Sequence, residues 1–143
     1  MFIGEFKHSL DPKGRIAVPA KFRKELVGGA IVTRGLDRCL FVFSRSEWEV
    51  LAKKIAALPI AQANSRAFGR LMLSGAMDAE IDQQGRILIP DYLREYAGLS
   101  KQAVVTGLMN RIEIWDEQSW KQYKAKTESA SDEIAEKMGE LGI

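Results

Sequence analysis

Reactive side chains are scarce in this 143-residue chain, which holds one cysteine and one histidine. Cys39 has no partner for a disulfide within the chain, so we expect a small apolar core residue in a reducing compartment. His8 has no second histidine or neighbouring cysteine with which to share a metal ion or build a catalytic triad. We therefore expect no enzyme, no metal site and no cofactor.

Long apolar runs and phosphate-binding loops are also missing. No apolar segment approaches the roughly 18 residues that cross a bilayer, and the first residues lack the basic and apolar pattern of a secretory leader. Gly14 and Gly85 are isolated glycines in turns and do not form a glycine-rich phosphate loop. We expect a cytoplasmic protein without membrane association or a small-molecule substrate, while a regulator that responds to a small ligand stays open.

Charge is unevenly divided in a chain whose net charge is only +2. Residues 1–71 hold thirteen Lys and Arg against six Asp and Glu, a net of +7, and residues 72–143 hold eight against thirteen, a net of −5. Such asymmetry points to a polyanion-binding surface on the first half. A chance division, or attraction between the halves across an interface, would give the same distribution, so charge alone leaves these interpretations open.

A nine-residue stretch occurs twice and organises the chain. Residues 11–19 read DPKGRIAVP and residues 82–90 read DQQGRILIP, so that Asp, Gly, Arg, Ile and Pro recur at the same spacing. The similarity continues through matched pairs: Phe22 and Leu93, Arg23 and Arg94, Leu26 and Ala97, Thr33 and Thr106, Trp48 and Trp120. A repeated unit of about fifty residues predicts two similar structural units. Because short strands leave exposed edges, we expect the two units to pair with each other.

Each copy is expected to fold as a hairpin, a short helix and a second hairpin. Pro12 presets a turn φ angle, the Asp11 side chain can accept hydrogen bonds from its own turn, and Gly14 tolerates positive φ. The expected elements are strands at 5–10, 15–18, 30–34 and 40–43 with a helix at 20–27, and strands at 77–81, 86–89, 104–108 and 112–115 with a helix after Pro90.

Helices are expected between the copies and after the second one. A capping box at Ser46-x-x-Glu49 predicts a helix that ends before Pro59, and residues 61–74 form another candidate helix. This apolar pair lacks catalytic side chains and suits a core or an oligomer interface. After a helix capped by Asp116, residues 127–143 are expected to be a flexible or weakly helical tail, frayed or disordered. The expected division is 1–50 for the first repeat, 51–75 for the linking helices, 76–126 for the second repeat and 127–143 for the tail.

The repeated Asp-x-x-x-Arg is the strongest chemical feature. As a structural pair, Asp11 with Arg15 and Asp82 with Arg86 would contribute about 0–1 kcal/mol each at the surface. An aspartate that bonds an arginine also orients its guanidinium toward a phosphate or a guanine edge, and a hairpin that carries such an arginine fits a DNA major groove. The first copy has more basic residues around its turn, so we expect it to dominate DNA binding.

The same residues resemble the MraZ family. The resemblance rests on Met1-Phe2-x-Gly4-Glu5, His8-Ser9-Leu10-Asp11-x-Lys13-Gly14-Arg15, Val18-Pro19-Ala20-Lys21-Phe22-Arg23, Asp82-x-x-Gly85-Arg86 and Leu99…Thr106-Gly107…Glu113-Ile114-Trp115. It covers about residues 1–126. It implies a β-rich α+β fold in which two tandem AbrB-like repeats of the SpoVT-AbrB type form a pseudo-two-fold, swapped-hairpin β-barrel with flanking helices.

The resemblance also implies a function. Proteins of the family that this chain resembles are DNA-binding transcriptional regulators that form homo-oligomeric rings. They bind tandem repeats in the promoter of the division and cell-wall gene cluster, which includes their own gene. This implies a nucleoid-associated protein that binds double-stranded DNA through Asp11, Lys13, Gly14, Arg15, Lys21, Arg23, Lys24, Asp82 and Arg86. An antitoxin-like module that acts mainly through a protein partner stays open. A general RNA-binding scaffold is disfavoured because the sequence lacks paired exposed aromatics for base stacking.

Overall fold

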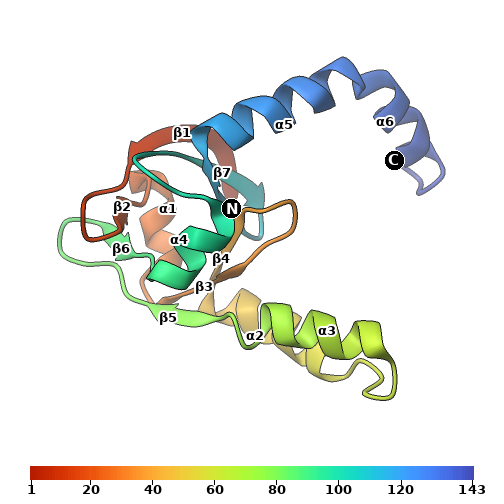
Figure 1. Ribbon diagram of the computed structural model, residues 1–143, viewed down its shortest axis with the longest axis horizontal. Coiled ribbons are helices and arrows are strands. Elements are labelled where there is room, and N and C mark those ends of the chain that lie inside the picture. Colours follow the sequence, from red (N-terminus) through yellow and green to blue (C-terminus); the bar gives the residue numbers. More distant parts are fainter.

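The structure, a computed structural model that describes residues 1–143, has two antiparallel sheets with helices at their margins (Figure 1). The strands are β1 (Phe2–Ser9), β2 (Arg15–Ala17), β3 (Ala30–Arg34), β4 (Leu40–Ser44), β5 (Met77–Ala79), β6 (Arg86–Leu88), β7 (Gln102–Met109) and β8 (Ile112–Asp116). The helices are α1 (Ala20–Arg23), which continues as a 3-10 turn (Lys24–Leu26), α2 (Arg45–Ala56), α3 (Ala63–Met72), α4 (Asp91–Ala97), α5 (Glu117–Ser129) and α6 (Ser131–Gly139). The larger sheet has the order β1-β7-β8-β4-β3-β5, and β2 pairs with β6. The β-rich α+β class is confirmed.

Strand pairing crosses between the two repeats. β1 pairs with β7 over its whole length, beginning at Phe2 opposite Met109, and β2 pairs with β6 through Ile16 and Ile87. The hairpin expected within the first copy exists only as its turn and one bridge, between Leu10 and Ile16. The expected first hairpin of each copy is therefore wrong in its strand pairing, because an alternating apolar pattern identifies strands but not their partners. The expected second hairpins are confirmed, since β3 pairs with β4 and β7 pairs with β8. The swapped arrangement that the family resemblance implies is confirmed.

Both repeats build one core. Phe22 and Leu93, which occupy matching positions in the two copies, are each 0% exposed and belong to the same buried cluster. Phe22 also meets the ring of Phe2 edge-on, with the centroids 5.2 Å apart. Since neither copy has a complete core or a complete set of strand partners of its own, we expect the two to fold as one cooperative unit.

Helices α2 and α3 pack together against the end of the sheet formed by β3 and β4 (Figure 1). Their apolar faces bury Ile55 and Met72 in a second cluster with Phe43. Helix α2 begins directly after β4, where the Ser44 Oγ accepts a hydrogen bond from the Glu47 N–H at 3.3 Å. The capping box predicted at Ser46 is therefore wrong by two residues, because no loop separates the strand from the helix.

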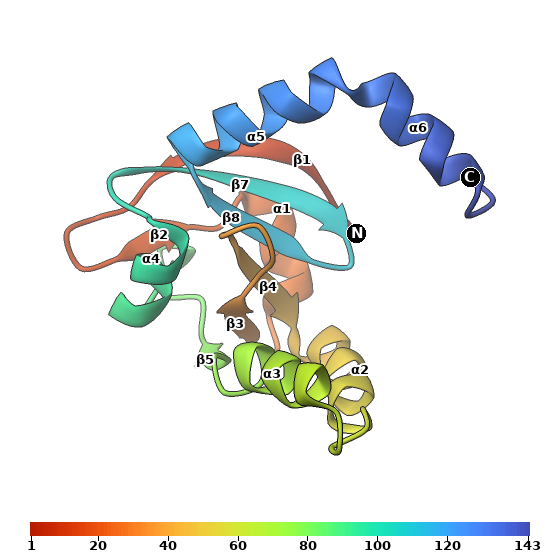
Figure 2. The same ribbon diagram turned by 45° about the vertical axis from the view of Figure 1, so that its right-hand side comes forward.

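Helices α5 and α6 form an arm on the second repeat (Figure 2). Asp116 caps α5 as predicted, its Oδ2 accepting from the Ser119 N–H at 3.1 Å. Residues 131–139 form α6, which agrees with the weakly helical alternative expected for the tail and not with a frayed or disordered one. Helix α6 buries no side chain and turns away from both sheets. None of the helices combines the length and the apolarity that a bilayer-spanning segment needs.

Candidate nucleic-acid interface

The first Asp-x-x-x-Arg motif forms a tight turn held by its own aspartate. The Asp11 Oδ1 accepts hydrogen bonds from the backbone N–H groups of Lys13 at 3.0 Å and Arg15 at 2.8 Å. The Gly14 N–H donates to the Asp11 carbonyl at 3.0 Å, and Gly14 has a φ of 85°. The aspartate thus organises the backbone of the turn, as the sequence predicts.

The second motif reproduces this turn. The Asp82 Oδ1 accepts from the backbone N–H groups of Gln84 and Arg86, both at 2.9 Å. Gly85 has a φ of 77° and donates to the Asp82 carbonyl at 2.9 Å. Two copies of one sequence motif therefore adopt one geometry, although the first carries Pro12 and Lys13 where the second carries Gln83 and Gln84.

The second oxygen of each aspartate orients an arginine. The Arg15 Nε donates to the Asp11 Oδ2 at 2.6 Å, and the Arg86 Nε donates to the Asp82 Oδ2 at 2.9 Å. The Arg86 Nη1 also lies 3.6 Å from the Asp11 Oδ2, so Asp11 faces both arginines. The Arg15 and Arg86 side chains stay 33% and 27% exposed. Each guanidinium is thus fixed through Nε. The outer nitrogens of Arg15 remain available to a ligand, whereas one outer nitrogen of Arg86 also faces Asp11.

The β2–β6 ribbon places both arginines on one face. Arg15 lies opposite Leu88, and Ala17 lies opposite Arg86, while the central pair of Ile16 and Ile87 is buried. Because side chains alternate along a strand, Arg15, Ala17, Arg86 and Leu88 share the outer face. Leu88 is 54% exposed, so this outer face combines two oriented cations with a small apolar surface. We call these four residues the ribbon face.

Each turn is braced by the other repeat. The Val18 N–H donates to the Gly85 carbonyl and the Ile89 N–H donates to the Gly14 carbonyl, both at 2.9 Å. Arg23, which the sequence predicts to bind DNA, lies against Gly85 and donates from Nε to the Val18 carbonyl at 2.9 Å. These contacts give Arg23 a structural role in positioning the second turn.

Arg94 braces the first turn in the same way. Its guanidinium lies against Gly14 and donates to the Ile89 carbonyl, and it pairs with Asp91. The sequence matches Arg94 with Arg23 but does not single it out as a site residue. The repeat could have identified Arg94, because an arginine occurs at the same position in both copies. In each copy this arginine lies against the glycine of the other copy's turn.

The remaining lysines lie around this site at different distances from the turns. Lys13 is exposed within the first turn. Lys21 lies on α1, where its Nζ packs over the Phe6 ring at 5.1 Å from the centroid. Lys24 is exposed in the following 3-10 turn. The structure thus brings Asp11, Lys13, Gly14, Arg15, Asp82 and Arg86 together at the ribbon, whereas Lys21 and Lys24 belong to the adjoining helical segment.

Acid should loosen both turns. Hydrogen bonds from the backbone and side chain of Arg15 hold the pKa of Asp11 below its ordinary value of 3.8, and those of Arg86 do the same for the pKa of Asp82. A depressed folded pKa gives stability that is fully present above the ordinary value and is lost as pH falls through the folded pKa. We expect the Asp11→Asn, Asp82→Asn double variant to have a lower urea midpoint than the wild type at pH 7. Its urea midpoint should also fall less than that of the wild type between pH 7 and pH 2.

The exposed Asp132 supplies the control for this acid test. Asp132→Asn should leave the urea midpoint and its pH dependence as in the wild type. Equal losses of stability in the double variant and the wild type between pH 7 and pH 2 would show that the turn aspartates do not carry the acid response.

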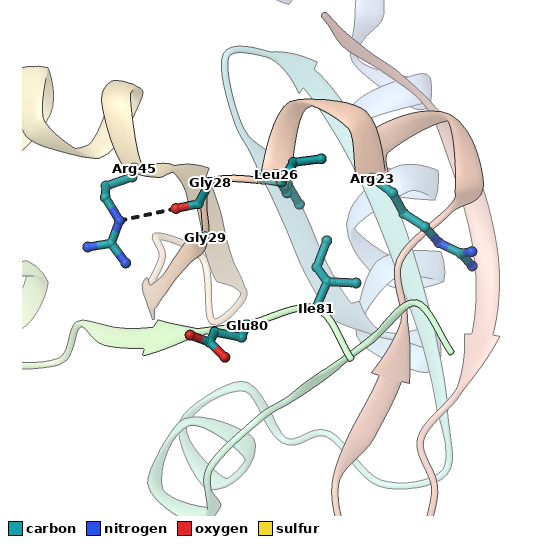
Figure 3. A pocket seen from close by; sticks show the side chains of 8 residues that line it. Arg23, Leu26, Gly28, Gly29, Arg45, Glu80 and Ile81 are labelled. Atoms are coloured by element: carbon teal, nitrogen blue, oxygen red, sulfur yellow. Dashed lines mark hydrogen bonds between the residues drawn. The ribbon is translucent and has the colours of Figure 1, made fainter. Parts of the chain in front are cut away.

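Small-ligand chemistry finds little support outside the ribbon. A cleft between the end of α1 and β5 is lined by Leu26 and Ile81, which face each other, and by Arg45 (Figure 3). Arg45 is already engaged, donating to the Gly28 carbonyl at 3.3 Å and to Asp78 at 2.9 Å. No group of three potential metal ligands occurs in the structure. The cleft is therefore a packing seam between the two repeats.

The two reactive side chains named by the sequence are both tied to the fold. His8 lies on β1, and burial, with a smaller contribution from Arg23, lowers its pKa. Cys39 is buried, its Sγ donates to the Leu36 carbonyl at 3.2 Å, and burial raises its pKa. A neutral thiol sealed in the core is a poor nucleophile.

Comparison with known proteins identifies the family of this doubled fold. The family described as "MraZ protein, putative antitoxin-like" matches twice, over residues 1–71 and 72–140. The chain belongs to the MraZ family. Both copies of the Asp-x-x-x-Arg turn fall within the matched segments, one in each, so the internal repeat is a property of the family pattern.

Full-length relatives support this membership of the MraZ family. The chain is 50% identical to a protein of Natranaerobius thermophilus and 52% identical to one of Halothermothrix orenii, in both cases over 143 residues and the whole of both chains. It is 51% identical to a protein of Carboxydothermus hydrogenoformans over 138 residues, 96% of each chain. All three are named "Transcriptional regulator MraZ". The resemblance seen in the sequence is confirmed, and the family's named role is regulation of transcription rather than enzyme catalysis.

Proposed function

We propose that this chain is a sequence-specific, double-stranded DNA-binding transcriptional regulator that reads DNA with the ribbon face and its two flanking turns. The observation that carries the proposal is the pair of aspartate-oriented arginines, Arg15 and Arg86, on the outer face of a two-stranded ribbon. A ribbon of this width fits the major groove. There, a guanidinium can bind the O6 and N7 atoms of guanine with two hydrogen bonds.

The residues around the ribbon divide into contacts to bases and contacts to phosphates. Arg15 and Arg86 are the base readers, and Leu88 offers an apolar contact of the kind that thymine methyl groups accept. Lys13, Lys21 and Lys24 would neutralise phosphates without reading sequence. Arg23 acts through the turn that it braces. Asp11 and Asp82 position the two arginines.

A single ribbon makes few contacts and would bind loosely at cellular salt. We therefore propose that the protein acts as a homo-oligomeric ring on tandem repeats in the promoter of the division and cell-wall gene cluster, including its own gene. Several ribbons on one assembly gain affinity through effective concentration when the DNA repeats match their spacing. The same proposal places the protein in the cytoplasm, associated with the nucleoid, and keeps the division into repeats at 1–50 and 76–126.

Binding should depend steeply on the number of DNA repeats. Fluorescence anisotropy on duplexes from directly upstream of the protein's own gene, with one to four repeats, is expected to show at least a tenfold gain in affinity, about 1.4 kcal/mol, on going from one repeat to two. Affinity should fall as salt rises. Duplexes of the same length and composition with scrambled sequence serve as the control.

Equal affinity for native and scrambled duplexes would refute sequence-specific reading. In that case the antitoxin-like alternative becomes the leading hypothesis, and a protein partner encoded beside this gene would be the next ligand to test. A preference for native sequence without any dependence on repeat number would keep the ribbon as the reader and remove the multivalent assembly from the proposal.

A further inference from the structure

A cleft flanks each of the two turns, and the two clefts occupy matching places in the repeats. The first cleft, of about 530 Å³, lies between the first turn and residues 98–101, the loop that joins α4 to β7. The second cleft, drawn in Figure 3, lies between residues 80–81, directly before the second turn, and residues 27–29, the loop that leads into β3. Arg94 lines the first cleft, and its match Arg23 lines the second. The two clefts can therefore be compared group by group.

The first cleft is lined mainly by polar groups. Ser9 ends β1, Ser100 and Lys101 belong to the loop, and Gln102 begins β7. The Ser9 Oγ donates to the Gln102 Oε1 at 3.3 Å, which leaves the Gln102 amide NH₂ free to donate. The backbone N–H groups of Ser100 and Lys101 find no acceptor within the chain. The cleft thus gathers several hydrogen-bond donors in one place.

The first cleft also holds one positive charge without a partner. Asp11 is the one acid in its lining, and it is already bonded to Arg15. Arg94 is paired with Asp91. Lys101 is exposed and forms no ion pair within the chain. Free donors around an unpaired ammonium group suit an anionic oxygen ligand such as a phosphate.

The loop that carries Lys101 is held in place before any ligand binds. The Leu99 N–H donates to the Arg94 carbonyl at 2.9 Å, which caps the end of α4. The Leu10 N–H donates to the Lys101 carbonyl at 2.8 Å, which joins the loop to the end of β1. Figure 2 shows the loop running into β7 beside the turn between β1 and β2. Because the loop is ordered already, binding there costs little conformational entropy.

The second cleft lacks these groups. Residues 27–29 are valine and two glycines, so this loop offers no polar side chain. Glu80 stands two residues before Asp82, where the first copy has Ser9 two residues before Asp11. Glu80 is exposed and forms no ion pair, whereas both arginines of this cleft are bonded to other groups of the protein. An unpaired carboxylate in the second cleft would repel an anion.

The ribbon brings the first cleft to the edge of the DNA groove. β2 and β6 are antiparallel, so the two turns lie at opposite ends of the ribbon, and the first turn is at the end where Arg15 faces Leu88. Three residues of strand span roughly 10 Å, and the major groove is about 12 Å wide. Groups beside the ends of the ribbon therefore meet the phosphates that border the groove.

We propose that the first cleft binds a phosphate of the DNA backbone, with Lys101 supplying the charge and Ser100 and Gln102 supplying hydrogen bonds, while the second cleft binds none. This inference rests on the proposed function and extends its site to a loop of the second repeat. The ribbon face is nearly two-fold symmetric, since Arg15 and Arg86 are related by the repeat. A phosphate contact at one end alone fixes the direction in which the ribbon reads its site.

Lys101→Ala tests the charge of the first cleft. On a native duplex with one repeat, the slope of log K against log salt should become shallower by about 0.9, which lowers affinity about eightfold at roughly 0.1 M salt. The preference for native over scrambled sequence should persist, because a phosphate contact carries no sequence information. Fluorescence anisotropy over a salt series measures both quantities. Lys53→Ala, which removes an exposed lysine on α2, is the control and should change neither.

The outcomes separate this inference from the proposed function. If Lys101→Ala and Lys53→Ala bind alike while the wild type still prefers the native duplex, the inference is overturned and the ribbon remains the reader. A wild type that binds neither native nor scrambled DNA overturns the proposed function and the inference together.

Exchanging one residue between the clefts gives a second test. Ser9→Glu places in the first cleft the acid that the second cleft carries, and it should lower affinity at least about tenfold. Glu80→Ser makes the reverse change and should leave affinity unchanged or higher. Both positions are exposed, so both variants should keep the melting temperature of the wild type within a few degrees. Equal affinities of the two variants would contradict the difference between the clefts.

Neutral phosphates identify the atom that is bound. In a set of native duplexes, one phosphate at a time is replaced by an uncharged methylphosphonate. At one position, on one side of the repeat, the replacement should weaken the wild type about eightfold and leave Lys101→Ala unaffected. A scan in which no position distinguishes the two proteins refutes the contact.

A free phosphate ion would bring the same chemistry to the cleft. Inorganic phosphate is therefore titrated against the DNA-free wild type and Lys101→Ala at constant ionic strength, and we expect no saturable binding to either. Saturable binding that Lys101→Ala loses would assign the cleft to a free anion and overturn its assignment to DNA.

Discussion

Arg15→Ala is expected to abolish specific DNA binding while the fold and the assembly remain intact. Each lost guanine contact costs about 1–3 kcal/mol and relaxes specificity at that base pair. Because several ribbons act together, the affinity for a duplex with several repeats should fall at least about 100-fold, to the level of scrambled DNA. Anisotropy titrations of wild type and variant on both duplexes, over a salt series, measure the effect.

Arg86→Ala should lower the affinity for the same duplex by less, about tenfold. The two arginines differ in what holds them: Arg15 pairs with Asp11 alone, whereas Arg86 pairs with Asp82 and also lies 3.6 Å from Asp11. Arg86 therefore has more of its nitrogens paired within the protein, and Arg15 has more of its outer nitrogens available for DNA. The turn of Arg15 also carries Lys13, whereas the matching position beside Arg86 is the uncharged Gln84.

Two further variants sharpen the Arg15 experiment. Arg15→Lys keeps the charge but loses the planar fork, so it should retain binding to scrambled DNA and lose the preference for native sequence. Lys53→Ala removes one exposed positive charge on α2, away from the ribbon. It should change neither the affinity for scrambled DNA nor the preference for native sequence. If Arg15→Ala and Lys53→Ala weaken binding equally, Arg15 contributes only charge, and the ribbon face is not the reader.

The local chemistry of the turns could be predicted from the sequence, because it depends on residues that are close in the chain. Asp11 caps its turn, Gly14 takes positive φ and Arg15 folds back on Asp11, all within four residues. The buried positions of Phe22 and Leu93 follow equally from the apolar pattern that the two copies share. Family resemblance added the pairing between repeats, which no local pattern contains.

Three features could not be predicted from local sequence patterns, because they depend on contacts between distant parts of the chain. β2 pairs with β6 although β1 is nearer in sequence. Arg94 binds over Gly14 because the swap brings the α4 segment to the first turn. Helix α6 buries no side chain, and neither the polarity of residues 127–143 nor their weak apolar stripe distinguishes a helix without a partner from a disordered tail.

Gly14→Ala and Gly85→Ala should each destabilise the protein by about 3 kcal/mol, roughly 10 °C in melting temperature for a domain of this size. Each glycine adopts positive φ, where a Cβ costs about 1–2 kcal/mol. The new Cβ at Gly14 would also overlap the Arg94 guanidinium and lie 2.9 Å from the Ile89 carbonyl oxygen. At Gly85 the Cβ would overlap Arg23. Both substitutions would break the bracing of one repeat by the other.

Gly98→Ala isolates the backbone contribution to this loss. Gly98 has a φ of 62°, but no atom lies within 4 Å of the position that its Cβ would occupy. Its substitution should therefore cost only the conformational term, about 1 kcal/mol. Urea unfolding of the three variants separates the two contributions. Equal losses in all three would mean that Arg23 and Arg94 move aside freely, and that the turns which carry Arg15 and Arg86 are held by their aspartates alone.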